Sequence, residues 1–202
     1  MSDLWTNDAP DAWRQALESY DDVIARQAVK PLPELERWYR EEFPAAIAAR
    51  EPAHITHAEM VRVTEWKMAR GIWRARNLAL VRGNAPDAVE RISRKALAAI
   101  PDPRTPIAEL AQLAGVGPAT ASAVAAAAAP EHYPFFDELV GAQVPGLGPV
   151  AFTPAYYGKY AAALRERALS LGGSWTPARV EQALWAHAGG KAGARAKDSG
   201  RR

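Results

Sequence analysis

The sequence predicts an all-α protein, and three observations lead to this prediction. Apolar residues recur at helical spacing through most of the chain, as expected for helices with one buried face. Prolines, some of them preceded by threonine, stand where these segments begin, and glycines stand where several of them end. No segment alternates apolar and polar residues like a half-buried strand. With 202 residues, of which 49% are hydrophobic, the chain is long enough to bury a substantial core.

Capping residues and prolines mark the helix boundaries. The expected helices span residues 11–30, 34–50, 56–69, 72–81, 86–100, 155–171 and 177–187. Thr56 and Glu59 match a capping box, in which each side chain accepts a hydrogen bond from the other residue's backbone amide. Pro44 lies within the second helix and predicts a kink or an end there. One domain is expected over residues 1–188, because residues 189–202 have the Gly/Ala/Lys/Arg-rich composition of a disordered basic tail.

Composition excludes several classes of function. The chain has no cysteine, which rules out disulfides, thiolate catalysis and cysteine-bound metal. Its four histidines show no zinc-ligand spacing, so neither a metal nor another cofactor is expected. The first residues lack the pattern of a signal peptide, and the longest apolar run, residues 123–130, is too short to span a bilayer. We therefore expect a cytoplasmic monomer without a membrane role.

Charge is unevenly distributed, although the net charge of the chain is only +2. Residues 1–59 have a net charge of −6, residues 60–100 a net charge of +6, and the remaining residues +2. The basic middle segment predicts a contact surface for a polyanion such as nucleic acid. The alternative interpretation is a solvated helix face.

The sequence Gly115–Val116–Gly117–Pro118 joins two short apolar helices between residues 106 and 129. Glycine permits the positive φ and close backbone approach of a tight turn, and proline is tolerated in the first turn of a helix. The turn therefore directs free backbone N–H groups outward at a helix N-terminus, where a phosphate can bind. The alternative is an ordinary tight turn between two helices.

This hairpin and a downstream aspartate resemble the helix-hairpin-helix and Gly/Pro-Asp (HhH-GPD) element of base-excision DNA glycosylases related to endonuclease III and the adenine glycosylases. The matching positions are Leu113, Gly115, Val116, Gly117, Thr120, Ala121, Pro134 and Asp137. The resemblance implies a two-lobed all-α fold with the hairpin and the aspartate at the mouth of a cleft between the lobes. It implies double-stranded DNA as the partner and association with the nucleoid when DNA is bound. The expected phosphate contacts are Gly115, Val116, Gly117, Ala119 and Thr120.

Departures from the family pattern narrow the implied activity. Bifunctional members have a lysine nucleophile directly before the threonine, where this chain has Ala119. The iron–sulfur cluster of some members is excluded by the absence of cysteine. After the aspartate the family usually shows a small residue and then an arginine, whereas this chain continues with Glu138, Leu139, Val140 and Gly141. The resemblance therefore implies a monofunctional DNA glycosylase without lyase activity; the alternatives are a non-catalytic helix-hairpin-helix DNA-binding protein and a helical protein-interaction domain.

Asp137 is the main candidate for catalysis. Cleavage of an N-glycosidic bond develops positive charge on the deoxyribose, and a carboxylate near C1′ would stabilise that charge or orient the attacking water. Water is the expected nucleophile, because Ala119 offers no amine. The alternative is that Asp137 only caps the helix that begins at Glu138, since aspartate is favoured at that position.

Basic and aromatic side chains interleave in residues 64–77. On one continuous helix, Lys67, Arg70 and Arg74 would form a stripe that contacts DNA phosphates. Glu65, on the same segment, would protonate or hydrogen-bond the leaving base. The alternative for Glu65 is an ion pair with a nearby cation.

An enzyme that acts on a base in duplex DNA must flip the base and hold it against aromatic or apolar walls. The candidates for such a wall are Trp66, Trp73 and Phe136. The alternatives are that both tryptophans are core residues and that Phe136 anchors its loop in the core.

Overall fold

The computed structural model describes residues 3–192 and shows an all-α fold over that range, as the sequence predicts. Its helices are α1 (Pro10–Glu18), α2 (Tyr20–Ala25), α3 (Leu32–Arg37), α4 (Phe43–Ala48), α5 (His57–Arg70), α6 (Ala75–Arg82), α7 (Pro86–Ala98), α8 (Thr105–Leu110), α9 (Pro118–Ala128), α10 (Glu138–Gly141), α11 (Pro154–Leu171) and α12 (Pro177–His187). A π-helical segment, η1 (Trp38–Glu42), joins α3 to α4. Among the described residues there is no strand, and no helix is both long and apolar enough to cross a membrane.

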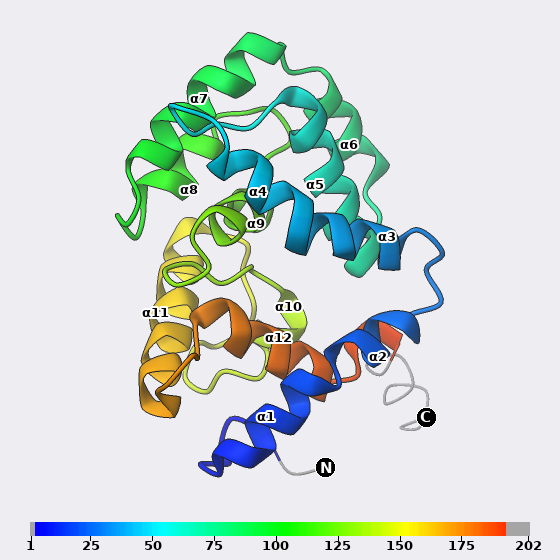
Figure 1. The fold of residues 1–202 in the computed structure, drawn as a ribbon, viewed down its shortest axis with the longest axis vertical. Helices are drawn as coiled ribbons and strands as arrows, with labels where there is room; N and C mark the ends of the chain where they lie inside the picture. The colour runs from blue at the N-terminus through cyan, green and yellow to red at the C-terminus, as the bar shows by residue number, and fades with distance from the viewer. Residues whose placement is uncertain (1–2, 193–202) are drawn as a thin grey trace.

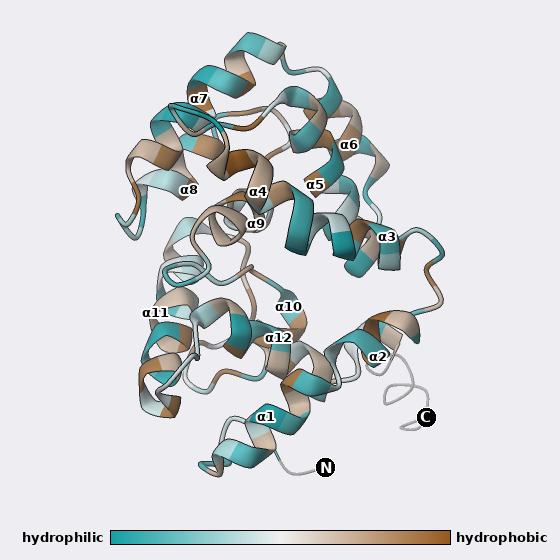
Figure 2. Ribbon diagram, viewed as in Figure 1, coloured by the Kyte–Doolittle hydropathy of each residue, from teal (hydrophilic) through white to brown (hydrophobic). Residues whose placement is uncertain are grey.

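The helices form two groups on either side of α9 (Figure 1). Helices α3 to α8 make up one group, and α1, α2 and α10 to α12 make up the other (Figure 1). Helix α9 packs against α4, α5 and α8, whereas α12 packs against α1, α2, α10 and α11. Hydrophilic and hydrophobic residues share most of the helices (Figure 2), as expected for amphipathic helices that each contribute one face to the core.

Helix α9 is buried on nearly all sides because most of its residues are alanine. Residues 119–127 are all buried, and such small side chains allow neighbouring helices to approach closely. The hydroxyl of Tyr39, in η1, donates a 2.7 Å hydrogen bond to the backbone carbonyl of Ala123. Because α9 is held from several sides, the hairpin at its N-terminus is held with it.

Helix starts follow the capping signals closely. Thr56 Oγ1 accepts a 3.3 Å hydrogen bond from Glu59 N, and Glu59 Oε2 accepts a 2.8 Å bond from Thr56 N, so the predicted capping box is confirmed. Thr153 and Thr176 cap α11 and α12, each followed by a proline in the first turn. These boundaries were predictable because neighbouring residues determine them.

Two of the long expected helices are interrupted. The helix expected over residues 11–30 consists of α1 and α2, which are separated at Ser19, and residues 26–30 are not helical. Residues 34–50 include η1, where the amide of Phe43 donates to the carbonyl of Trp38 five residues earlier. Pro44 follows directly and has no amide hydrogen to continue the ordinary α-helical bonding, which explains the wide turn at this point.

The tail begins later than the sequence suggests. Within residues 189–192, the amide of Ala192 donates a 3.0 Å hydrogen bond to Gln27 Oε1, and Lys191 pairs with Glu138. These four residues therefore pack against the folded chain rather than belonging to a disordered segment. The rest of the predicted tail, residues 193–202, lies outside the described residues.

Candidate active site

The hairpin between α8 and α9 is fixed on helix α6. Gly115 has a φ of 76°, and a Cβ there would lie 2.6 Å from the backbone oxygen of Asn77, so only glycine fits. Asn84 binds the turn through both amide atoms: its Oδ1 accepts from Ala114 N at 2.9 Å, and its Nδ2 donates to Ala114 O at 3.0 Å. This contact joins residues that are 30 positions apart in the sequence, so no local pattern predicts it.

The second glycine of the hairpin, Gly117, faces open space. It is the N-cap of α9 with an ordinary φ of −104°, and a Cβ there would meet no atom within 4 Å. The first turn of a helix leaves its backbone N–H groups without acceptors inside the helix, which applies here to Ala119 and Thr120. The side chain of Val116 is buried, and its amide donates a 3.1 Å hydrogen bond to the carbonyl of Leu113. This corrects the expectation that the Val116 amide contacts a phosphate.

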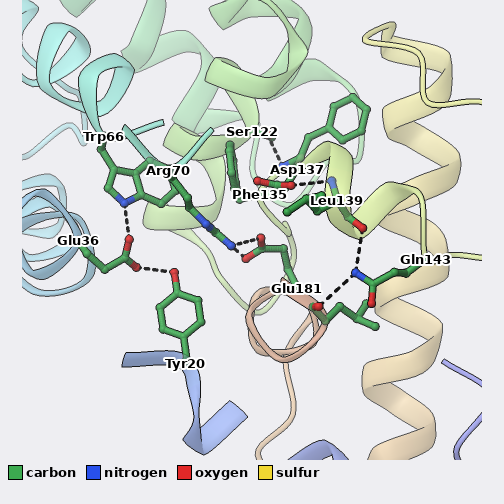
Figure 3. Close-up of polar contacts among 12 residues, drawn as sticks. Tyr20, Glu36, Trp66, Arg70, Ser122, Phe135, Asp137, Leu139, Gln143 and Glu181 are labelled. Carbon is green, nitrogen blue, oxygen red and sulfur yellow. Dashed lines mark hydrogen bonds and ion pairs between the residues drawn. The ribbon is translucent and has the colours of Figure 1, made fainter. Parts of the chain in front are cut away.

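Asp137 is held at the N-terminus of α10. Its Oδ1 accepts a 2.7 Å hydrogen bond from the amide of Leu139, so the capping interpretation of this residue is confirmed. The segment before it is fixed from two helices: Phe136 N donates to Ser122 Oγ at 2.9 Å, and Tyr160 donates to the carbonyl of Phe135 at 2.7 Å. Figure 3 shows Ser122, Asp137 and Leu139 together at this point. Capping does not exclude catalysis, because it uses only one of the two carboxylate oxygens.

A cavity of about 280 Å³ joins the hairpin to Asp137. The hairpin and the start of α9 contribute Gly115, Gly117, Pro118, Ala119 and Thr120, and segments nearer the C-terminus contribute Phe135, Phe136, Asp137, Glu138, Phe152 and Lys191. The remaining lining residues come from the end of α5 and the start of α6, namely Lys67, Gly71, Ile72, Arg74 and Asn77. The cavity thus brings together eight of the predicted site residues: Lys67, Arg74, Gly115, Gly117, Ala119, Thr120, Phe136 and Asp137.

Trp66 lies in the core and does not line this cavity, which corrects its interpretation as a wall for a flipped base. Its side chain is fully buried, and its ring stacks on Tyr39 with a centroid distance of 3.5 Å and an interplanar angle of 9°. Its Nε1 donates a 2.6 Å hydrogen bond to Glu36 Oε2 (Figure 3). The sequence could not separate a core tryptophan from a pocket tryptophan, because both occupy an apolar helix position.

Arg70 is also buried, which corrects its interpretation as a phosphate contact. Its guanidinium pairs with the carboxylate of Glu181 at 2.5 Å, and neither side chain is exposed by more than 1% (Figure 3). The expected basic stripe does not form, because α5 ends at Arg70 and residues 71–74 connect it to α6. Lys67 and Arg74 consequently lie on separate elements that border the cavity.

Two further candidates lie outside the cavity lining. Trp73 is on the connector between α5 and α6 and is 56% exposed. Glu65 pairs with Arg82 at 2.7 Å, which matches the alternative given for it. Phe152 lines the cavity instead, with its ring centroid 5.1 Å from that of Phe136. Phe152 is not among the site residues predicted from the sequence, although it follows the Gly/Pro-rich residues 141–149 and was a visible signal.

Buried charged groups connect the two helix groups. Burial raises the pKa of Glu181 from 4.5 to about 7, an effect that the nearby Arg70 opposes. Burial would also raise the pKa of Glu36, but Arg40 and Arg70 outweigh it and lower that pKa. Glu36 accepts from Tyr20 at 2.7 Å as well as from Trp66 (Figure 3). Glu181 and Glu36 therefore belong to the same buried network, and their pKa values are shifted in opposite directions.

The cavity wall combines a helix N-terminus with two carboxylates, Asp137 and Glu138, and three cations, Lys67, Arg74 and Lys191. Glu138 and Lys191 pair with each other. Asp137 is 5% exposed, whereas Arg74 is exposed and Lys67 is mostly buried. Comparison of the chain with protein-family models, with curated proteins and with solved structures found no match. The site is therefore interpreted from its own geometry.

Proposed function

We propose that this protein is a monofunctional DNA glycosylase with a two-lobed helix-hairpin-helix fold, which hydrolyses the N-glycosidic bond of a damaged or modified base in duplex DNA. One observation carries the proposal: a single cavity is lined both by the hairpin at the N-terminus of α9 and by Asp137. The backbone amides of the hairpin suit a DNA phosphate. The carboxylate of Asp137 suits the cationic sugar that forms when the bond to the base breaks.

The cavity supports a division of roles among its residues. A nucleotide flipped out of the duplex would enter it, with the base against Phe136 and Phe152 and the deoxyribose toward Asp137. The carboxylate would stabilise positive charge at C1′ or orient the attacking water. Ala119 supplies no amine at the hairpin position, and we assign water as the nucleophile in the base-release step.

DNA contact is assigned to the hairpin and to two of the three cations of the lining, Lys67 and Arg74. Such contacts fix the position of the backbone without reading its sequence. The partner is double-stranded DNA, because a flipped base requires a duplex whose backbone is held on both sides of the flipped nucleotide.

Replacement of Gly117 by aspartate should weaken DNA binding without disturbing the fold. The new side chain has room, since no atom lies within 4 Å of the Cβ position and the φ of −104° suits any residue. Its charge would repel the phosphate, a cost that corresponds to at least about a tenfold weaker Kd. Fluorescence anisotropy with a labelled duplex measures the change. Gly117→Asn, which has the same size without the charge, is the control and should bind much more tightly; equal binding by both variants would contradict the placement of the phosphate.

Release of free base tests the proposed function directly. Duplexes that carry oxidised, alkylated, deaminated or mismatched bases would be incubated with the wild-type protein, and the liberated base would be identified by mass spectrometry. We expect release from one class of duplex, with strand breaks only after hot alkali. Duplex binding without release from any member of the panel would favour the non-catalytic DNA-binding alternative.

A further inference from the structure

Lys67 is a lysine in the lining of the cavity whose side chain has no hydrogen-bonding or ion-pair partner among the described residues. It lies in the last turn of α5, mostly buried, and borders the same space as Asp137 and Ala119. Its ammonium group makes no hydrogen bond or ion pair with any residue between 3 and 192. The other lysine of the lining, Lys191, differs in this respect, because it pairs with Glu138.

The surroundings of Lys67 favour an uncharged amine. Burial, together with the nearby positive charge of Arg74, lowers the pKa of Lys67 from 10.5 to about 8. A substantial fraction of its amino groups is therefore neutral near pH 8, whereas an ordinary lysine is almost wholly protonated there. Neutral lysine amines attack carbonyl carbons and form imines. A phosphate contact alone would not require a desolvated lysine, since an exposed one retains its charge at this pH.

We propose that Lys67 captures the open-chain aldehyde of an abasic deoxyribose in this cavity as a reversible imine. The proposal rests on the proposed function for the identity of the carbonyl compound. The nitrogen attacks C1′, a C–N bond forms, and the carbonyl oxygen leaves as water with the two amine protons. Hydrolysis reverses the step and returns the free amine and the aldehyde. No oxidant or reductant is consumed, and the step follows base release rather than replacing it.

In the bifunctional DNA glycosylases the lysine nucleophile lies in the hairpin, at the position that Ala119 occupies here on α9. Lys67 instead borders the cavity from α5. Both residues border the same space, so an amine from α5 meets the same sugar that Asp137 would stabilise. The imine would keep a reactive aldehyde bound until the product leaves.

Borohydride trapping tests the imine directly. The full-length protein would be mixed with a duplex that carries a preformed aldehydic abasic site, and sodium borohydride would reduce any imine to a stable amine link. We expect a covalent protein–DNA adduct, and peptide mass mapping should place it on Lys67. The variant Lys67→Arg keeps a positive charge but offers no such nucleophile, and should lower the adduct yield at least about tenfold.

Lys191→Arg is the matched control, because it changes the other lysine of the lining. It should retain most of the adduct. Anisotropy measurements on each variant separate loss of the nucleophile from loss of DNA binding. An adduct that maps to a different residue, or that persists in Lys67→Arg, would overturn the proposal. Absence of an adduct from wild-type protein that binds the abasic duplex would overturn it as well.

The yield of trapped adduct in wild type should rise with pH through about 8, following the neutral fraction of the Lys67 amine. Since the abasic site is preformed, the experiment does not need base release by this protein. An adduct on Lys67 without base release from any duplex would leave this inference standing and remove the proposed function. Base release without an adduct would overturn this inference and leave the proposed function standing.

Discussion

The variant Asp137→Asn is expected to release base at least about a thousandfold more slowly than wild type while its stability stays nearly unchanged. Asparagine offers the same Oδ1 acceptor to the amide of Leu139, so the cap of α10 is preserved. It cannot offer the negative charge that a cationic sugar requires. Single-turnover measurement of base release, with thermal unfolding beside it, checks both halves of this expectation.

Two other variants complete the test of Asp137. Asp137→Ala should be equally slow and also less stable by about 1 kcal/mol, because it loses the cap. Glu65→Gln should release base at close to the wild-type rate, since Glu65 pairs with Arg82 outside the cavity lining. If Asp137→Asn released base as fast as wild type, Asp137 would be a capping residue and nothing more.

Replacement of Arg70 by methionine is expected to lower the free energy of unfolding by about 3–5 kcal/mol. The substitution leaves the carboxylate of Glu181 buried without its partner at 2.5 Å. The pair joins α5 in one helix group to α12 in the other, so its loss also weakens the contact between the groups. Urea denaturation at pH 8 measures the effect.

The pH dependence of this loss follows from Glu181. Its pKa in the folded protein, about 7, lies above the ordinary value of 4.5, so folding favours the protonated form. The stability that this group contributes is present below pH 4.5 and is lost as the pH rises through 7. The cost of Arg70→Met should therefore be smaller at pH 5 than at pH 8. Arg82→Met, which breaks the exposed pair with Glu65, should cost no more than about 1 kcal/mol; equal costs for the two arginines would contradict this account.

Sequence patterns predicted the features that neighbouring residues determine. The capping box at Thr56, the caps of α11 and α12, and the glycine turn all depend on residues within a few positions of one another. The same holds for Asp137, whose capping bond reaches only two residues along the chain. Each of these positions could be recognised without knowing what packs against it.

Contacts between distant segments were not predictable in this way. Lys67 and Arg70 are three residues apart on α5, yet one lines the cavity and the other is buried against Glu181, 111 residues away. A buried arginine and a DNA-binding arginine look alike in the sequence, because the ion-pair partner that distinguishes them is far away along the chain. Trp66 was misinterpreted for the same reason, because its partner Glu36 comes from α3.

The proposed role of Asp137 is to stabilise positive charge on a deoxyribose in the cavity. The most direct measurement compares the Kd for two duplexes, one with a cationic pyrrolidine in place of the sugar and one with a neutral tetrahydrofuran. This comparison does not depend on which base is released. We predict that wild type binds the pyrrolidine duplex at least about tenfold more tightly, and that Asp137→Asn loses this preference. Equal affinity of wild type for the two duplexes would contradict this role.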